Sequence, residues 1–438
     1  MASTALRIPN RGGLGIASHA VRFFLRPLQI LMASPVLLFL GALTAMLLRH
    51  PDVNFYEIDR VAFGLLVIGV LCRAVVERRQ ILIMERATWP MMGLTLLAVA
   101  SAIGRPFENE TWSLLAAKFI VPFALFHLAG FVFEDERSFR QFELFCLITL
   151  AYLSFTAIAF VAGARSLIFP RFILDESLGF QPDRARGPLL QAVANGVSLN
   201  LLGLLALHAY QRGRVRGVKI VLLLVSVPVA ILATMTRAVW LSFGGTLFAL
   251  AFVSRSVFCR RACLVLVLVA ATGLAVVLSS AELDGALKDR LEESGPVDFR
   301  KAVYSGGWQM FIERPLTGWG FHQMPSELPR YVSGYREKVL YPHNTYLELL
   351  VEHGVVGLAF YLWLILELWR LGRSRIPAGE KAGFLDAHFH QMWPIVLGVY
   401  WVNAAMVVMS YQFVNALLFT MAGMLAAQRR RAEAFDLC

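Results

Sequence analysis

The sequence predicts an all-α integral membrane protein with about twelve transmembrane helices and a long extracytoplasmic loop that contains short helices. Hydrophobic residues make up 58% of the 438 positions and charged residues only 16%, and the mean hydropathy is +0.62. A soluble globular chain is nearer half apolar and a quarter charged. Apolar runs of bilayer length recur along nearly the whole chain, and short basic segments separate them.

A helix needs about 20 mostly apolar residues to cross a bilayer. Residues 217–254 are too long for one helix, so a break is expected near 234–237, and a second near Ser410 splits the last two runs. The predicted spans are 28–48, 59–76, 88–104, 113–132, 142–163, 189–210, 217–235, 237–254, 262–281, 345–369, 391–409 and 411–428.

The basic residues support this arrangement, because cytoplasmic loops of membrane proteins carry an excess of Lys and Arg. The net charge of +11 is therefore a topology signal and not a sign of nucleic-acid binding. Both termini are predicted in the cytoplasm, and the first run is too long for a cleaved signal peptide. The basic clusters expected inside are 73–86, 212–219, 255–261, 370–381 and 429–431.

The five cysteines predict no disulfide framework, because none falls in an extracytoplasmic loop of this topology. Cys259 and Cys263 have no companion ligands nearby in the sequence, so a zinc site there is not expected.

The chain is expected to divide into three sections. Residues 1–180 form N-terminal transmembrane helices, and residues 371–438 form C-terminal ones. Residues 181–370 form a core that includes the long outward loop at 282–344. Within that loop, the spacing at 299–315 predicts a helix, either in the interface plane or packed on the bundle.

Arg237 is the clearest candidate for chemistry. It lies at the predicted turn between two apolar helices, with no acidic residue nearby in the sequence. Charges at membrane depth are costly and usually functional. Arg237 is thus available for an anionic ligand, although an arginine here could also reach lipid headgroups or cap a helix.

His343 lies where the long outward loop meets the next helix, and histidine is the natural proton acceptor near neutral pH. A helix-start residue satisfied by the backbone is the plainer interpretation. Glu348 and Glu352 follow at i,i+4 spacing on that helix, where an interior polar contact would also explain them.

A third cluster, with Arg184 and Arg186, precedes the predicted span 189–210, and helix parity places it on the same outward face as Arg237 and His343. Guanidinium groups bind phosphate oxygens in bidentate fashion and stabilise negative charge on a diphosphate leaving group. An imidazole can accept a proton from an attacking hydroxyl. Together these groups predict glycosyl or phosphoryl transfer from a lipid diphosphate.

At these residues the chain resembles the bacterial O-antigen ligase and polymerase superfamily, whose shared segment is called the Wzy_C domain. Residues 236–241 are similar to the family's Ser-Arg-Gly-x-Trp-Leu, and residues 314–320 to its Pro-Leu-x-Gly-x-Gly. Residues 342–357 are similar to its His-Asn-x-x-Leu and Glu-x-Gly-x-x-Gly. Order and spacing agree over about residues 180 to 370.

The resemblance implies a metal-independent, inverting glycosyltransferase of the bacterial inner membrane that uses no cofactor. It would move a glycan from undecaprenyl diphosphate to an acceptor glycolipid or polysaccharide in the periplasm. Arg237 would contact the diphosphate, and His343 would be the catalytic histidine. Substrate-binding positions would include Asn344 and Tyr346 of the same motif, and either Arg184 or Arg186.

The motifs do not separate a ligase, which would use lipid A-core or a similar acceptor, from a repeat-unit polymerase. The long second outward segment slightly favours a ligase, because a ligase must also bind a second glycolipid beside the donor. A multi-pass transporter is the rival from another class, but no related halves are visible in the sequence. A metal-dependent transferase would need outward carboxylates, and Glu108 with Glu110 is the one short pair of that kind.

Overall fold

The computed structural model describes residues 34–50, 58–253, 257, 260–266, 268, 295–332, 342–377 and 383–436. All regular secondary structure in these residues is helical. The all-α class is therefore confirmed for the described part of the chain.

Most of the predicted spans correspond to observed helices. Four continuous helical segments are long and apolar enough to cross a membrane. They are Asn109–Val132, made of α5 (Asn109–Leu115), η1 (Ala116–Ile120) and α6 (Val121–Val132), then α7 (Glu136–Val161), α8 (Ala192–Gln211) and α15 (Thr345–Leu371).

Further helices match the other predicted spans. The shorter apolar ones are α2 (Pro35–Leu47), α4 (Thr88–Ile103), α9 (Val218–Ala233) and α10 (Arg237–Val253). The rest are α3 (Ile58–Glu77), α16 (Ala387–Ala404) and α17 (Gln412–Asp436). The predicted ninth span, 262–281, lies mostly outside the described residues, so the total of twelve stays a prediction.

Both predicted breaks are present. Residues 234–236 separate α9 from α10, and residues 405–411, which include Ser410, separate α16 from α17. At the first break Met235 has a positive φ of 47°. L-residues rarely adopt this conformation, which ends α9 abruptly and lets α10 start in a new direction.

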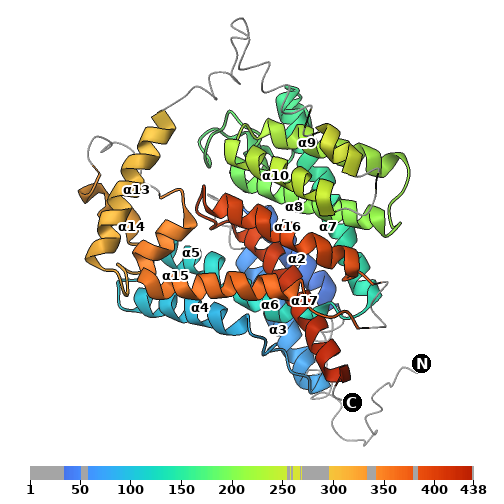
Figure 1. Cartoon of the computed structure of the whole chain (residues 1–438), viewed down its shortest axis with the longest axis horizontal. Coiled ribbons are helices and arrows are strands. Elements are labelled where there is room, and N and C mark those ends of the chain that lie inside the picture. The colour runs from blue at the N-terminus through green and yellow to red at the C-terminus, as the bar shows by residue number, and fades with distance from the viewer. Residues whose placement is uncertain are drawn as a thin grey trace, which may run out of the picture.

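Most of these helices pack as a bundle around a large apolar core. In Figure 1, α4, α15, α9 and α10 run across the view. Within the bundle α17 packs along α6, α16 packs along α10, and α7 packs on α8 and α9. Core residues such as Phe39, Phe142 and Trp393 are fully buried, although they come from distant parts of the chain.

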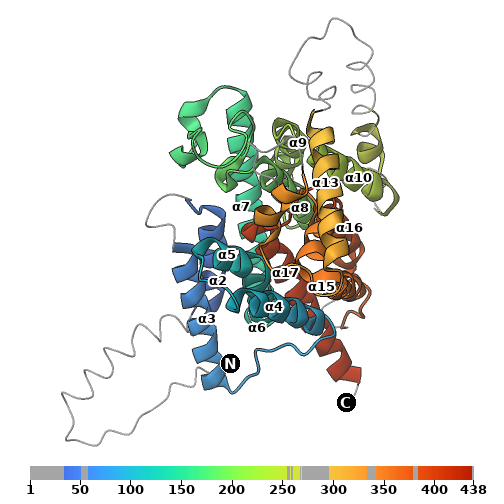
Figure 2. The same cartoon turned by 90° about the vertical axis from the view of Figure 1, so that its left-hand side faces the viewer.

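A second, smaller core lies at one end of the bundle. It joins α13 (Gly295–Glu313), α14 (Met324–Glu327) and the 3-10 turn η5 (Leu328–Arg330) to α15. The helix expected at 299–315 is therefore present as α13, which runs across the direction of α15 (Figures 1 and 2). The buried members of this core are Val303, Met310, Met324, Leu328, Val332 and Val351.

Candidate active site

Arg237 is the first residue of α10, and its side chain is exposed. Among the described residues it makes no hydrogen bond or ion pair. Its neighbours hold the turn instead: the indole nitrogen of Trp240 donates to the carbonyl oxygen of Ile231 at 3.2 Å, and the hydroxyl of Thr236 donates to the carbonyl of Thr234 at 2.8 Å. The motif thus fixes the backbone and leaves the guanidinium available.

The segment with the two upstream arginines lies directly beside this turn. The amide of Ala185 donates to the carbonyl of Ala233, the last residue of α9, at 3.2 Å. The side chain of Asn195 on α8 donates to the carbonyl of Ala185 at 2.9 Å. The fold therefore brings the Arg184 segment and the Arg237 turn together, which only helix parity had indicated.

The structure gives the two upstream arginines different surroundings. Arg186 is 1% exposed, and its guanidinium donates to the main-chain carbonyls of Ile173, Asp175 and Leu178. Burial lowers the pKa of Arg186, and Asp175 opposes that shift. An arginine keeps its charge in such a site, so this one stabilises the 173–178 loop.

Arg184 is also buried, at 8% exposed, and it lies beside a neighbouring carboxylate. Its Nε lies 3.8 Å from Oδ2 of Asp183, whose side chain is 61% exposed. A pair that is half open to solvent is weak. Exchanging the Asp183 pair for another anion therefore costs less than breaking the buried carbonyl contacts of Arg186.

His343 lies two residues before the first residue of α15, Thr345. Its backbone has a positive φ of 45°, a conformation that costs free energy and is found disproportionately at functional sites. The hydroxyl of Tyr304 donates to its carbonyl oxygen at 3.3 Å, and its ring centroid lies 6.2 Å from that of Phe299. Burial, with a smaller contribution from Arg300, lowers the pKa of the half-buried imidazole.

The next two predicted residues have clear roles in the fold. Asn344 caps α15, since its side-chain oxygen accepts from the amides of Tyr346 at 2.9 Å and Leu347 at 3.0 Å. The Tyr346 hydroxyl points to the carbonyl of Trp401 on α16, at 3.4 Å. These contacts hold the start of α15 and thereby the position of His343.

Two motifs that are distant in the sequence interlock. The amides of Trp319 and Gly320 donate to the carbonyls of Val351 and Glu352 at 2.9 and 2.8 Å, where α15 is interrupted by Gly354 with φ 62° and ψ −163°. A Cβ on Gly354 would lie 2.2 Å from the carbonyl oxygen of Leu316. The glycines of both motifs thus serve the close approach of two backbones.

A buried polar cluster beneath this junction was not anticipated as a unit. Lys118 lies in η1, a π-helical turn of the kind often found at functional sites, and its Nζ is 2.6 Å from Oε2 of Glu348. One turn further along α15, Oε1 of Glu352 accepts from the amide of His322 at 2.8 Å. A lone lysine inside an apolar run was the signal that could have found this pair.

Arg105 ties the end of α4 to the same junction, because its guanidinium donates to the carbonyl of Trp319 at 2.6 Å. Burial lowers the pKa of His322 in this loop. No group of three or more His, Cys, Asp or Glu side chains suited to a metal occurs in the part of the chain that the structure describes. The glutamate pair at 108 and 110 is solvent-exposed.

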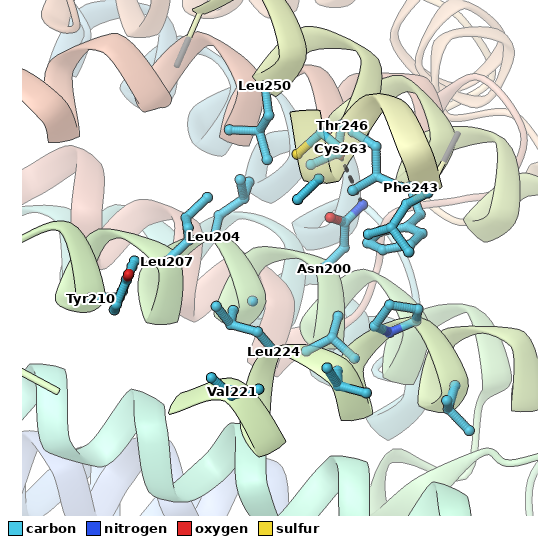
Figure 3. Close-up of a pocket in the computed structure, with 18 residues that line it drawn as sticks. Asn200, Leu204, Leu207, Tyr210, Val221, Leu224, Phe243, Thr246, Leu250 and Cys263 are labelled. Carbon is cyan, nitrogen blue, oxygen red and sulfur yellow. Dashed lines mark hydrogen bonds between the residues drawn. The ribbon is translucent and has the colours of Figure 1, made fainter. Parts of the chain in front are cut away.

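An apolar cavity of about 490 Å³ lies between α8, α9 and α10 (Figure 3). On α10 it is lined by Phe243, Thr246 and Leu250, and the side-chain amide of Asn200 donates to the hydroxyl of Thr246 at 3.2 Å. Arg237 is six residues before Phe243 and so projects about 120° away around the helix. The cavity therefore does not open towards Arg237.

The structure joins Arg237 and His343 only indirectly. Helix α16 packs against both α10 and α15, and its C-terminal end meets the start of α15, where the Thr345 hydroxyl donates to the carbonyl of Val407 at 2.9 Å. Among the described residues no hydrogen bond or ion pair connects the two side chains. A substrate would have to span them.

Comparison with known proteins identifies this region. A family model described as O-antigen ligase, Wzy_C, matches residues 198–362. The matched segment includes the Arg237 turn, the interlocked glycine motifs and His343. A search of curated proteins found no match to the chain.

Proposed function

Because residues 198–362 match a family model described as O-antigen ligase, we propose that this membrane protein is a glycan transferase. Its donor would be a glycan on undecaprenyl diphosphate, and its acceptor a glycolipid such as lipid A-core, on the periplasmic face of the bacterial inner membrane. The family and the apolar helices support a membrane enzyme of the ligase and polymerase superfamily. The identity of the donor, the identity of the acceptor and the orientation in the membrane are proposed in addition.

The observation that carries it is the exposed guanidinium of Arg237 on a turn whose other side chains are committed to the backbone. Arg237 makes no hydrogen bond or ion pair within the described part of the chain, and it lies next to the Arg184 segment. Such an arginine suits a diphosphate, which accepts paired N–H donors. We assign Arg184 as the upstream donor, because the donors of Arg186 are already used by carbonyls.

In the proposed reaction the acceptor hydroxyl loses its proton to the imidazole of His343 as its oxygen attacks the anomeric carbon. The new C–O bond forms while the bond from that carbon to the diphosphate oxygen breaks, with inversion. The leaving undecaprenyl diphosphate carries the electron pair, and Arg237 with Arg184 stabilises its charge. No metal is assigned to any step.

Asn344 and Tyr346 would act here by holding the first turn of α15 next to the substrate, since their polar atoms already have backbone partners. His343 would then be presented by a rigid helix start. Such preorganisation is what places a general base within reach of the hydroxyl.

Analysis of glycans in a deletion strain tests the function. We expect full-length chains to accumulate on undecaprenyl diphosphate and finished lipopolysaccharide to disappear. Single repeat units on the acceptor would instead assign a polymerase. Unchanged lipid-linked glycan with a transport defect would refute both.

The orientation has its own test, with single cysteines and an impermeant thiol reagent in intact cells. Cysteine in place of Asp183 or Lys301 should react from outside, and cysteine in place of Arg216 should react only after permeabilisation. All three positions are exposed. The reverse pattern would place Arg237 and His343 in the cytoplasm and contradict the periplasmic reaction.

A further inference from the structure

Helix α13 has an exposed stripe whose polarity changes along its length. Trp308, Ile312 and Leu316 follow at spacings of four and are 53%, 60% and 66% exposed. Trp308 and Ile312 share one face of α13, and Leu316 lies in the turn that follows the last helical residue, Glu313. The same face further towards the N-terminus carries Ser305 and Lys301, which are polar and exposed. The apolar half of the stripe is therefore confined to the C-terminal end.

The apolar half continues onto the end of a predicted transmembrane helix. Ile103 and Phe107, at the end of α4 and just after it, are 67% and 76% exposed. Arg105 between them donates to the carbonyl of Trp319, three residues after Leu316. The two exposed apolar groups therefore lie at the same end of the bundle.

The direction of α13 fits a membrane interface. In Figure 1 α13 runs across the direction of α4 and α15. An amphipathic helix that lies in the interface buries its apolar face at the boundary between headgroups and acyl chains. Trp308 suits that depth, because tryptophan is enriched at membrane–water interfaces.

The same helix holds His343 from the other side. The Tyr304 hydroxyl donates to the His343 carbonyl, and Phe299 lies against its ring. Beyond the C-terminus of α13, the loop is locked into the α15 kink through Trp319 and Gly320. An interaction that fixes the depth of α13 relative to the membrane therefore also fixes the depth of His343.

We propose that the stripe Trp308–Ile312–Leu316 is seated in the outer-leaflet lipid surface, and that α13 in this way holds His343 at the depth of a lipid-borne diphosphate. The seating in lipid is argued from the exposed stripe and the direction of α13, and it does not depend on the proposed function. Its consequence for His343 rests on the proposed function, so the two parts need separate measurements.

The first measurement places an environment-sensitive fluorophore on single cysteines in the full chain, reconstituted in phosphatidylethanolamine and phosphatidylglycerol vesicles. Ile312→Cys and Leu316→Cys should be quenched by lipids brominated near the headgroup, and Ser305→Cys by aqueous iodide. Equal iodide quenching at all three would overturn the proposal. Protection of residues 312 and 316 from both quenchers would assign the stripe to a protein contact and overturn it too.

The second measurement uses the double variant Ile312→Glu with Leu316→Glu, and Ser305→Glu as the matched control on the same face. All three positions are exposed, so detergent-solubilised thermal stability should not change. Misplacing a catalytic group by about 1 Å can cost about 10²-fold, so kcat of the double variant should fall by about tenfold or more with KM little changed. An unchanged kcat, with quenching as expected, would leave the lipid seat standing and refute its role in positioning His343.

Discussion

The ammonium nitrogen of Lys118 lies 2.6 Å from Oε2 of Glu348, and both side chains are nearly buried, at 11% and 8% exposed. This pair joins a π-helical turn of one predicted span to the first turn of α15, directly after His343. Without Lys118, Glu348 would face Glu352 as a second carboxylate one turn away on the same helix face, and such like-charge pairs are unfavourable.

We therefore expect Lys118→Met to destabilise the protein by about 3–5 kcal/mol, the range for removing one partner of a buried ion pair. Adding Glu348→Gln should recover most of that loss, because the orphaned charge is removed as well. Thermal unfolding in detergent measures both. Lys219→Met, at an exposed position, is the control. Equal stability of the wild type and Lys118→Met would show that the pair contributes nothing.

Gly354 should tolerate no side chain. Its φ of 62° with ψ of −163° is accessible essentially to glycine alone, and departures of this kind cost about 1–3 kcal/mol before any clash. A Cβ would also lie 2.2 Å from the carbonyl oxygen of Leu316. We expect Gly354→Ala to lower thermal stability and yield, whereas Gly244→Ala, which meets nothing within 4 Å, should match the wild type.

The Arg237→Lys variant separates charge from geometry. A residue that only reaches lipid headgroups needs a cation, whereas a diphosphate clamp needs the planar fork that an ammonium lacks. We expect normal membrane insertion and a loss in rate approaching about 10²–10³-fold, the range for removing one fixed donor.

The control for that variant is Arg165→Lys, an exposed arginine that is remote from the motifs in the sequence and is predicted to face outward. Arg105 is unsuitable, because its guanidinium is bonded to Trp319 at the α15 junction. Full activity of Arg237→Lys would contradict the diphosphate clamp and indicate that Arg237 only contacts lipid headgroups.

The pH profile of kcat/KM should report His343. A general base must be neutral, and burial together with Arg300 lowers the His343 pKa below its ordinary 6.5. Activity should therefore persist as the pH falls through 6.5 and decline only at lower pH. Arg300→Gln removes a positive charge that disfavours the protonated imidazole, so the acidic limb should move to higher pH.

If Arg300→Gln moved the limb to lower pH, or left it in place, the residue that titrates would not be His343. The variant His343→Ala complements this measurement. It should lose about 10²–10⁴-fold in rate, the usual contribution of a general base, while retaining donor binding.

Transfer by the purified enzyme should continue in excess EDTA, because guanidinium groups are proposed to carry the charge of the leaving diphosphate. The measurement is the initial rate with lipid-linked donor and acceptor, before and after chelation. Loss of activity that magnesium or manganese restores would favour a carboxylate-bound metal, with Glu108 and Glu110 as the first residues to substitute.

The sequence by itself determined the helical membrane class, the break before Arg237 and the helix at α13. These features depend on the hydropathy and length of a single segment, and contacts with distant parts of the chain are not needed to predict them. It also singled out Arg237 and His343, since charged and titratable groups are rare in apolar surroundings.

Only the tertiary structure decided what the remaining motif residues do. Arg184 and Arg186 look alike in the sequence, yet in the fold the guanidinium of Arg186 is occupied by the carbonyls of residues 173, 175 and 178. The glycines at 318 and 354 are separated by many residues, and their reason is the contact of two backbones. Lys118 acquires a partner only when α15 packs beside it. These partners are determined by tertiary packing, and the periodicity of a single segment does not predict them.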